Sequence, residues 1–420
     1  MRNYIQRDLA DYAQQCAQWY PIVSLIGPRQ SGKSTLVKHT FPHYTYVTLD
    51  DDNMRFLAQT DPLAFLKANK PPLVIDEAQY APPLFNAIKR TCDETDKPGQ
   101  YILTGSHNFL LTKRITESLA GRCALLTLLP FAYTELRTAH TVLQKKKAPL
   151  TSTPHTSAPP TSGSLTSAPL TSIEASIQRG GYPRLYDKAI PVKRFYQDYL
   201  ASYVQRDVSD YLGIQNLDAF HTMLYLLADR AGQILNKAKL ARDLGIDVKT
   251  VKSWLSALKA SNLIFMLRPY YKNHSKRLIK SPKLYFYDTG LLCYLLGIES
   301  ETTLFRSDKF GSVLENYIIL ERMKYYFNKG EQGRLYYYRD DSKREVDLID
   351  ATAEAKSGLI SAEIKTAMTY NSKFQRPLMQ VSDELGISQD MRYIIMRAER
   401  SFSLGGCHIF SLEDWLLHKK

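Results

Sequence analysis

Residues 27–34 read GPRQSGKS, in which two glycines, a lysine and a hydroxyl have the spacing of a phosphate-binding loop. Gly27 and Gly32 let the backbone curl so that its N–H groups face phosphate oxygens at a helix N-terminus. Lys33 is expected to reach the β- and γ-phosphates, and Ser34 to ligate Mg²⁺. The predicted ATP-binding residues are Gly27, Pro28, Arg29, Gln30, Ser31, Gly32, Lys33, Ser34, Thr35 and Asp76.

Asp76 and Glu77 end the apolar run LVIDE at residues 73–77. Two acids at the end of a buried strand are costly unless both have a role. We expect Asp76 to hold Mg²⁺ and Glu77 to polarise the attacking water. Capping of the following helix is the competing interpretation, and the complete phosphate loop upstream favours the catalytic one.

Two further positions could act on the γ-phosphate. The strand QYILTGS ends in Thr104 and Ser106, and the sequence does not choose firmly between them as the sensor residue. Arg122 could be an arginine finger supplied by a neighbouring subunit or an ordinary surface arginine, because fingers have no local signature. Both alternatives stay open at this stage.

A second set of chemical residues lies near the C-terminus. In AEIK, residues 362–365, Glu363 and Lys365 share one face of a strand. Asp347 lies on the preceding strand, which a short turn links as an antiparallel neighbour, and Glu315 is on the inward face of a helix. A buried carboxylate needs a metal, a cation or a hydrogen-bond donor. A surface ion pair is the competing interpretation of Glu363 and Lys365.

The elements that must position these residues follow from the hydrophobic pattern. Before residue 140, apolar strands alternate with helical stretches, which predicts a parallel sheet covered by helices. Residues 234–268 have helix-turn-helix spacing followed by a strand, which predicts a winged helix. From about residue 310, a helix, three strands, a helix and a strand predict a smaller α/β unit. The Ser/Thr/Pro-rich stretch 144–172 has the composition of a disordered insertion.

These patterns divide the chain into four parts. We predict an ATPase core at 1–140, a disordered insertion at 141–172, a helical lid with a winged helix at 173–300, and a nuclease-like domain at 301–420.

Composition bears on partners and location. The net charge of +13 favours a polyanion as partner, and a basic run could form a DNA-contacting wing or a solvated hairpin used in packing. That run contains Lys272, Lys276, Arg277, Lys280 and Lys283, and the helix before it carries Lys249, Lys252 and Lys259. The five scattered cysteines and the absence of an apolar leader or spanning segment predict a cytoplasmic protein without a membrane partner.

Several motifs carry a family resemblance. GPRQSGKST, LVIDEAQ, YILTGS, SLAGR, LLPFAYTEL, GGYPRL, KLYFYDTGLL and FGSVLENYI together resemble the prokaryotic AAA-type ATPases joined to a C-terminal domain of unknown function. The resemblance implies a P-loop NTPase core, a helical lid with a winged helix, and an α/β domain similar to restriction endonucleases. The acid and lysine spacing is similar to the PD-(D/E)XK core. In that resemblance Asp347 and Glu363 bind Mg²⁺, Glu315 assists the metal, and Lys365 orients or activates water.

Two functions remain open from the sequence. The first is a Mg²⁺-dependent ATPase that acts on nucleic acid, DNA first, through the winged helix and the nuclease-like domain. The alternative is a nucleotide-switched protein-interaction or DNA-binding module with an inactive C-terminal domain. A homo-oligomer is compatible with either.

Overall fold

The computed structural model describes residues 4–105, 111, 115, 117–147, 172–202, 214, 216–271 and 281–417. The predicted insertion therefore lies outside the described residues, apart from 141–147 and 172. Ser106, Lys272, Lys276, Arg277 and Lys280 also lie outside them. In the described parts of the chain, no helix combines the length and apolar character needed to cross a bilayer.

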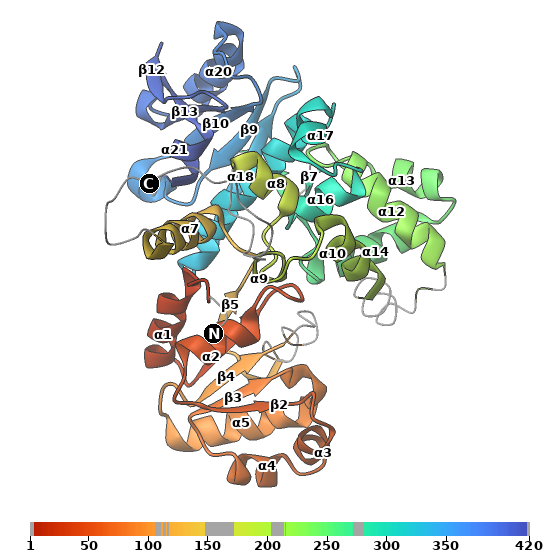
Figure 1. Cartoon of the computed structure of the whole chain (residues 1–420), viewed down its shortest axis with the longest axis vertical. Helices are drawn as coiled ribbons and strands as arrows, with labels where there is room; N and C mark the ends of the chain where they lie inside the picture. Colours follow the sequence, from red (N-terminus) through yellow and green to blue (C-terminus); the bar gives the residue numbers. More distant parts are fainter. Residues whose placement is uncertain are drawn as a thin grey trace, which may run out of the picture.

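An N-terminal α/β domain is built on a five-stranded parallel sheet of order β2-β3-β4-β1-β5 (Figure 1). The strands are β1 (Ile22–Ile26), β2 (Thr45–Thr48), β3 (Leu73–Asp76), β4 (Tyr101–Thr104) and β5 (Cys123–Thr127). The central strands β1, β3 and β4 are buried apolar runs, as expected for a parallel sheet covered on both faces. Because the strands are parallel, the loops after them leave from one edge, where the phosphate loop, Asp76 and Thr104 meet.

Helices cover both faces of this sheet. They are α1 (Leu9–Trp19), α2 (Lys33–Thr40), α3 (Asp52–Thr60), α4 (Pro62–Ala68) and α5 (Pro82–Thr95). The apolar sides of α1 and α2 share one core with Val23 and Leu25 of β1. Those of α3, α4 and α5 share a second core with Ile22 of β1 and Leu73 of β3. The sheet is therefore held rigid from both sides.

The middle of the chain is helical. Its helices are α7 (Tyr133–Lys147), α8 (Ile173–Arg179), α9 (Arg184–Asp187), α10 (Val192–Tyr199), α12 (Leu217–Asp229), α13 (Lys237–Leu244), α14 (Val248–Ala260), α16 (Thr289–Leu295) and α17 (Glu301–Arg306). Gly245 ends α13 in the left-handed conformation, and Asp247 caps α14 by accepting from the backbone N–H of Thr250 at 2.9 Å. The turn between these two helices is thus fixed by local sequence.

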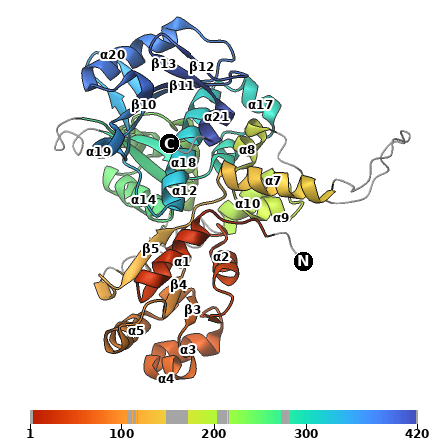
Figure 2. The same ribbon diagram turned by 90° about the vertical axis from the view of Figure 1, so that its left-hand side faces the viewer.

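An eight-stranded mixed sheet of order β12-β13-β11-β10-β9-β8-β6-β7 forms the C-terminal part (Figures 1 and 2). Its strands are β6 (Ile264–Pro269), β7 (Lys283–Phe286), β8 (Leu335–Arg339), β9 (Glu345–Asp350), β10 (Ile360–Lys365), β11 (Arg392–Met396), β12 (Phe402–Leu404) and β13 (Cys407–Ser411). The helices packed on it are α18 (Phe310–Asn328), α20 (Gln375–Leu385) and α21 (Leu412–Leu417), and the short helix α19 (Glu354–Ser357) connects β9 to β10.

The middle and C-terminal parts share one hydrophobic core. Residues of α12, α14 and α16 belong to the same buried cluster as those of α18 and β10. The pair β6–β7, which follows α14, joins the C-terminal sheet through β8. The middle and C-terminal parts of the chain are therefore continuous in packing.

Candidate functional site

The phosphate loop has the backbone geometry that its glycines allow. Gly27 has φ +149°, and a Cβ there would lie 2.1 Å from the carbonyl oxygen of Leu128. Gly32 has φ +95° and precedes the first turn of α2. The hydroxyl of Ser31 is buried without a hydrogen-bond partner in the described residues. The loop thus curls at a helix N-terminus, where backbone N–H groups favour an anion.

The Lys33 ammonium is folded back onto this loop. Its Nζ donates to the carbonyl oxygens of Gly27 and Pro28 at 2.8 and 2.9 Å. Burial lowers the pKa of Lys33 to about 8, although the carboxylates of Glu77 and Asp76 oppose this shift. A phosphate in the loop would add negative charge beside this buried ammonium and would stabilise its protonated form.

Asp76 gathers three hydroxyl groups around one buried carboxylate. The Ser34 hydroxyl donates to Oδ2 at 2.8 Å, Tyr46 donates to the same oxygen, and Thr104 donates to Oδ1. Hydroxyl and carboxylate oxygens are the donors that Mg²⁺ prefers, so Ser34 and Asp76 fit the predicted ion. Thr104 is fully buried against Asp76, and Tyr46 is a member of this group that the sequence did not reveal.

Glu77 adopts a left-handed backbone conformation, with φ +56° and ψ +40°. This conformation costs about 1–3 kcal/mol for a residue other than glycine, and such strain concentrates at functional sites. Its side chain lines the cleft above the loop and accepts a hydrogen bond from Gln79. The position suits a residue that orients a water molecule.

A cleft of about 930 Å³ opens beside the loop. One wall is the P-loop and the start of α2, the region that includes Arg29, Gln30, Lys33, Ser34 and Thr35. The facing wall comes from the N-terminal segment and from residues 183–188 of the middle part, including α9. Tyr4 stacks on His39 at this cleft with ring centroids 3.8 Å apart. The cleft is large enough for a nucleoside triphosphate.

Arg7 is a positioning residue that no motif indicated. Its Nη1 donates to the Ser31 carbonyl of the P-loop at 2.8 Å, Nη2 to the Leu129 carbonyl at 2.7 Å, and Nε to Glu135 at 2.9 Å. Glu135 also accepts from the backbone N–H of Ala132 at 2.8 Å. The P-loop is thereby fixed to the segment that leads out of β5.

Arg122 lies outside this cleft. It pairs with Asp93 on α5, and its side chain is 35% exposed. An arginine that serves a neighbouring subunit would need such exposure, so its role as a finger stays a prediction.

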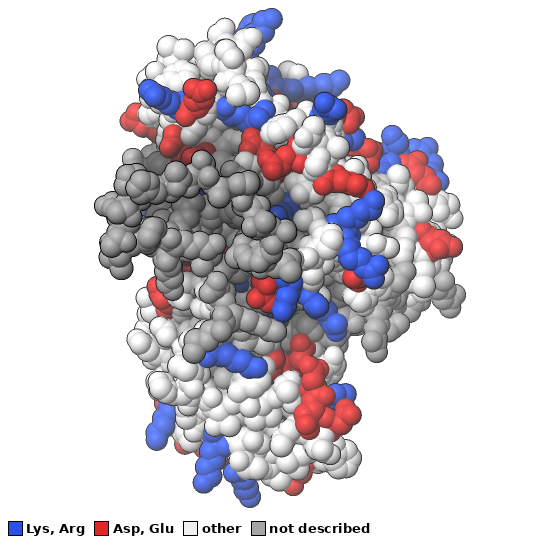
Figure 3. Space-filling model, in the orientation of Figure 1, with Lys and Arg blue, Asp and Glu red and all other residues white. Residues whose placement is uncertain are grey.

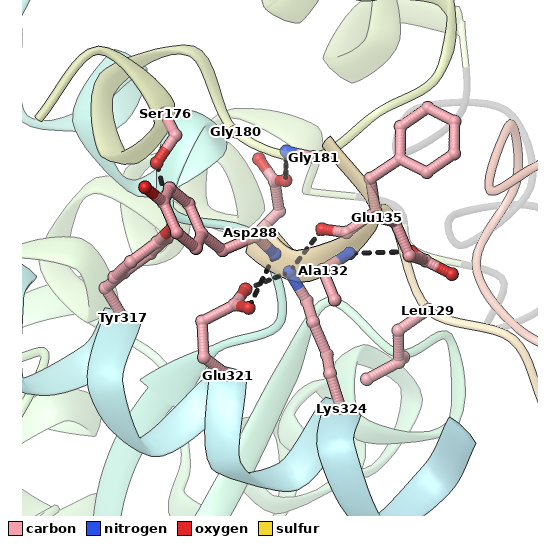
Figure 4. A network of polar contacts seen from close by, with 12 residues as sticks. Leu129, Ala132, Glu135, Ser176, Gly180, Gly181, Asp288, Tyr317, Glu321 and Lys324 are labelled. Carbon is pink, nitrogen blue, oxygen red and sulfur yellow. Dashed lines mark hydrogen bonds and ion pairs between the residues drawn. The ribbon is translucent and has the colours of Figure 1, made fainter. Parts of the chain in front are cut away.

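Figure 4 shows a buried polar network that connects the segment 129–135 to the C-terminal helix α18. Glu321 accepts from the backbone N–H of Tyr133 at 2.8 Å. Lys324 donates to the Phe131 carbonyl at 2.8 Å and to Glu321 at 2.8 Å. Phe131 also donates its N–H to the Gly181 carbonyl at 2.8 Å. One short segment therefore connects the N-terminal α/β domain, the middle part and the C-terminal helix.

The C-terminal acid set is assembled as the strand order predicted. β9 and β10 are antiparallel neighbours, and Asp347 Oδ2 accepts from the backbone N–H of Ile364 at 2.8 Å. Lys365 pairs with Glu363 Oε1. Burial and the charge of Asp347 raise the pKa of Glu363 to about 8, and the same two causes raise that of Glu315 to about 7.

One atom of this set is unsatisfied. Glu363 is 7% exposed, and its Oε2 is buried without a hydrogen-bond partner. A cation beside Asp347 and Glu363 would satisfy this oxygen, so the two residues fit a metal. Among the described residues, however, no three Asp, Glu, His or Cys side chains converge to hold an ion.

Lys283 corrects the prediction of a solvated or DNA-contacting basic run. Its side chain is 3% exposed, and Nζ lies 2.9 Å from Glu315 Oε1 and 2.6 Å from Glu345 Oε1. Burial alone would lower the pKa of Lys283, but the carboxylates, chiefly Glu315 and Asp347, raise it above its ordinary value. The prediction was wrong for this lysine because β7, at one end of the C-terminal sheet order, is a buried strand.

The fold and the phosphate site define a P-loop ATPase type of domain. Residues 20–137 match the family model described as AAA domain, and residues 310–415 match the domain of unknown function DUF4143. Residues 170–302 match the domain of unknown function DUF8612. The chain therefore carries an AAA-type P-loop ATPase domain and a C-terminal domain of the DUF4143 type.

Similar proteins occur in distant microbes. An uncharacterized protein of Mycobacterium tuberculosis is 29% identical over 347 residues, which cover 82% of this chain and 70% of that protein. One of Haemophilus influenzae is 20% identical over 439 residues, covering 97% of this chain and 98% of its own. Among solved structures, the Walker-type ATPase of Pyrococcus abyssi has a TM-score of 0.43 at 15% identity, and the match covers 70% of this chain and 96% of that one.

Proposed function

We propose that the chain is a Mg²⁺-dependent ATP hydrolase. The observation that carries this proposal is the Ser34 hydroxyl 2.8 Å from Asp76 at the base of a cleft that Lys33 also lines. Ser34 and Asp76 would hold the ion, which stabilises charge on the phosphates when bound. Lys33 would turn from the loop carbonyls to the phosphates, and Glu77 would orient the attacking water.

Phosphate release from ATP by the purified full chain tests this function. Lys33→Ala and Asp76→Asn should each reduce the rate at least about 100-fold because they remove charge stabilisation of the transition state. Glu77→Gln should retain ATP binding while hydrolysis is lost. Arg90→Ala is the matched control, because Arg90 is 70% exposed and its ion pair, with its helix neighbour Glu94, is itself exposed. Unchanged hydrolysis in Lys33→Ala would refute the proposal.

A second activity, metal-dependent cleavage of nucleic acid, is favoured by the unsatisfied Glu363 Oε2 beside Asp347. Asp347 and Glu363 would hold the ion, and Lys365 would orient water near the scissile phosphate. Glu315 would assist through its charge, because Lys283 and Tyr285 already donate to its Oε1. Cleavage of DNA and RNA with Mg²⁺ or Mn²⁺ should be lost in Lys365→Ala. It should persist in Lys356→Ala, a nearby exposed lysine on α19. Hydrolysis of ATP without any cleavage would favour the nucleotide-switched binding module instead.

Nucleic-acid binding through a winged helix is supported by fewer observations than the two activities above. Lys249, Lys252 and Lys259 are exposed on α14. On the face drawn in Figure 3, however, the described basic and acidic side chains are interspersed. Each lysine that contacts a phosphate should contribute about one unit to the slope of log affinity against log salt. Replacing the three lysines by alanine should reduce this slope, and an unchanged slope would exclude α14 as the contact.

A further inference from the structure

We propose that the buried Lys283 ammonium occupies the position between Glu315 and Glu345 in which a divalent ion would otherwise bind. One ion position then remains in this group of carboxylates, beside Asp347 and Glu363. That remaining position rests on the proposed metal role of those two residues, whereas the role of Lys283 does not.

The contacts of Lys283 are those of a bound cation rather than of a surface lysine. Its Nζ bridges Glu315 Oε1 at 2.9 Å and Glu345 Oε1 at 2.6 Å. The two carboxylates come from different elements, α18 and β9, and the lysine comes from β7. An isolated backbone bridge to Ile234 also holds Lys283 in place. Charge attraction and hydrogen-bond geometry together hold a buried ammonium between two carboxylates.

Glu315 has little capacity left for a metal. Its Oε1 also accepts from the Tyr285 hydroxyl at 2.5 Å. Because the Lys283 ammonium and the Tyr285 hydroxyl both donate to Oε1, a metal ion at this oxygen would have to displace them.

Charge balance points the same way. The carboxylates of the region are Glu315, Glu345, Asp347 and Glu363, and the cations are Lys283, Lys365 and Arg339, whose Nη1 lies 3.2 Å from Glu345. With all four carboxylates ionised, as metal binding requires, four negative groups against three positive ones leave a single negative charge. One divalent ion changes this to a single positive charge, whereas a second would leave three positive charges in buried surroundings, which is strongly unfavourable.

The contrast between Glu315 and Glu363 defines where an ion can enter. Glu315 Oε1 has two partners, Lys283 and Tyr285, whereas Glu363 Oε2 has none in the described residues. Removal of the Lys283 charge should therefore open a second ion position at Glu315. The first position, at Glu363, should be unaffected.

Counting bound Mn²⁺ on the nucleotide-free full chain by electron paramagnetic resonance tests this inference. Lys283→Met should bind one more Mn²⁺ per chain than the wild type. The double variant Lys283→Met/Glu315→Gln should return to the wild-type count, and Lys283→Arg, which keeps the charge, should not gain an ion. Asp347→Asn should remove one ion from the wild type.

The outcomes separate the inference from the proposed nuclease-like function. If folded Lys283→Met gains no ion, or if the wild type loses two ions in Asp347→Asn, the role of Lys283 is refuted. The second of these results is available even if Lys283→Met does not fold. If Asp347→Asn removes no ion from the wild type but Lys283→Met gains one that needs Glu315, the metal role of Asp347 and Glu363 fails and that of Lys283 stands.

Discussion

The backbone N–H of Gly181 donates to the Asp288 carboxylate at 2.8 Å, which ties the wall of the nucleotide cleft to the loop after β7. Asp288 also accepts from the Tyr196 hydroxyl at 2.6 Å and from the Leu291 N–H at 2.8 Å. Pro183, two residues after Gly181, lines the cleft. A fully buried carboxylate thus holds the facing wall of the ATP site in place.

Asp288→Asn should change how stability depends on pH. Burial, the largest cause, raises the pKa of Asp288 above its ordinary value in spite of its hydrogen bonds. A carboxyl whose pKa is raised by folding contributes stability that is complete below its unfolded pKa and is lost as pH rises through its folded pKa. Asp288→Asn should therefore cost about 1–3 kcal/mol near pH 4 and less near pH 8.

Thermal unfolding midpoints at several pH values check this prediction. Asp390→Asn is the control, because the Asp390 side chain is 91% exposed and its contact with His408, at 4.0 Å, is screened by solvent, so its replacement should change the pH profile little. A constant difference between Asp288→Asn and the wild type from pH 4 to pH 8 would contradict the assignment.

Gly27→Ala should disable the phosphate loop. The new Cβ would lie 2.1 Å from the Leu128 carbonyl, a backbone atom that cannot move without disturbing β5. We expect a cost of about 3 kcal/mol or more and at least tenfold weaker ATP binding. Gly121→Ala is the control: its φ is +78° with nothing within 4 Å, so strain alone should cost about 1 kcal/mol and ATP affinity should not change. Equal effects of the two substitutions on ATP affinity would refute the clash.

Arg7→Met should weaken both stability and nucleotide binding. It would leave the buried Glu135 carboxylate without its cation, with the backbone N–H groups of Asp8 and Ala132 as its remaining donors, at a cost of about 3–5 kcal/mol. It would also release the Ser31 carbonyl of the P-loop. Arg90→Met, which removes an exposed ion pair, should cost less than about 0.5 kcal/mol. Urea unfolding and ATP titration on the same samples separate the two effects. Normal ATP affinity in folded Arg7→Met would show that Arg7 does not position the loop.

The sequence reveals the parts of the site that are local. The P-loop and Asp76 could be predicted because short motifs encode a strand, a turn and a helix start. Arg7 and Glu135 could not, because their contact spans 128 residues and neither has a motif. The prediction for Lys283 was wrong because this lysine follows a run of basic residues in the sequence, which is typical of an exposed segment. Its burial depends on long-range packing: β7 pairs with β6, which joins the C-terminal sheet through β8, and all four residues of β7 are buried.

Lys324→Met should loosen the junction between the ATPase domain and α18. The substitution removes the cation from Glu321 and the donor from the Phe131 carbonyl, both in buried surroundings. Leaving one buried charge unpaired costs about 3–5 kcal/mol. Lys324→Met/Glu321→Gln should recover part of this loss, because the glutamine is uncharged and can still accept from the Tyr133 N–H.

Lys329→Met is the matched control for the junction, because Lys329 is exposed at the end of α18 and should have little effect on stability. Thermal unfolding with and without ATP measures the coupling as well as the stability. Phe131 also donates a backbone hydrogen bond to Gly181, which lies beside the cleft. Lys324→Met should therefore reduce the increase in unfolding temperature that ATP provides. If ATP raises the unfolding temperature equally in Lys324→Met and Lys329→Met, the contact between α18 and the ATPase domain is not coupled to nucleotide binding.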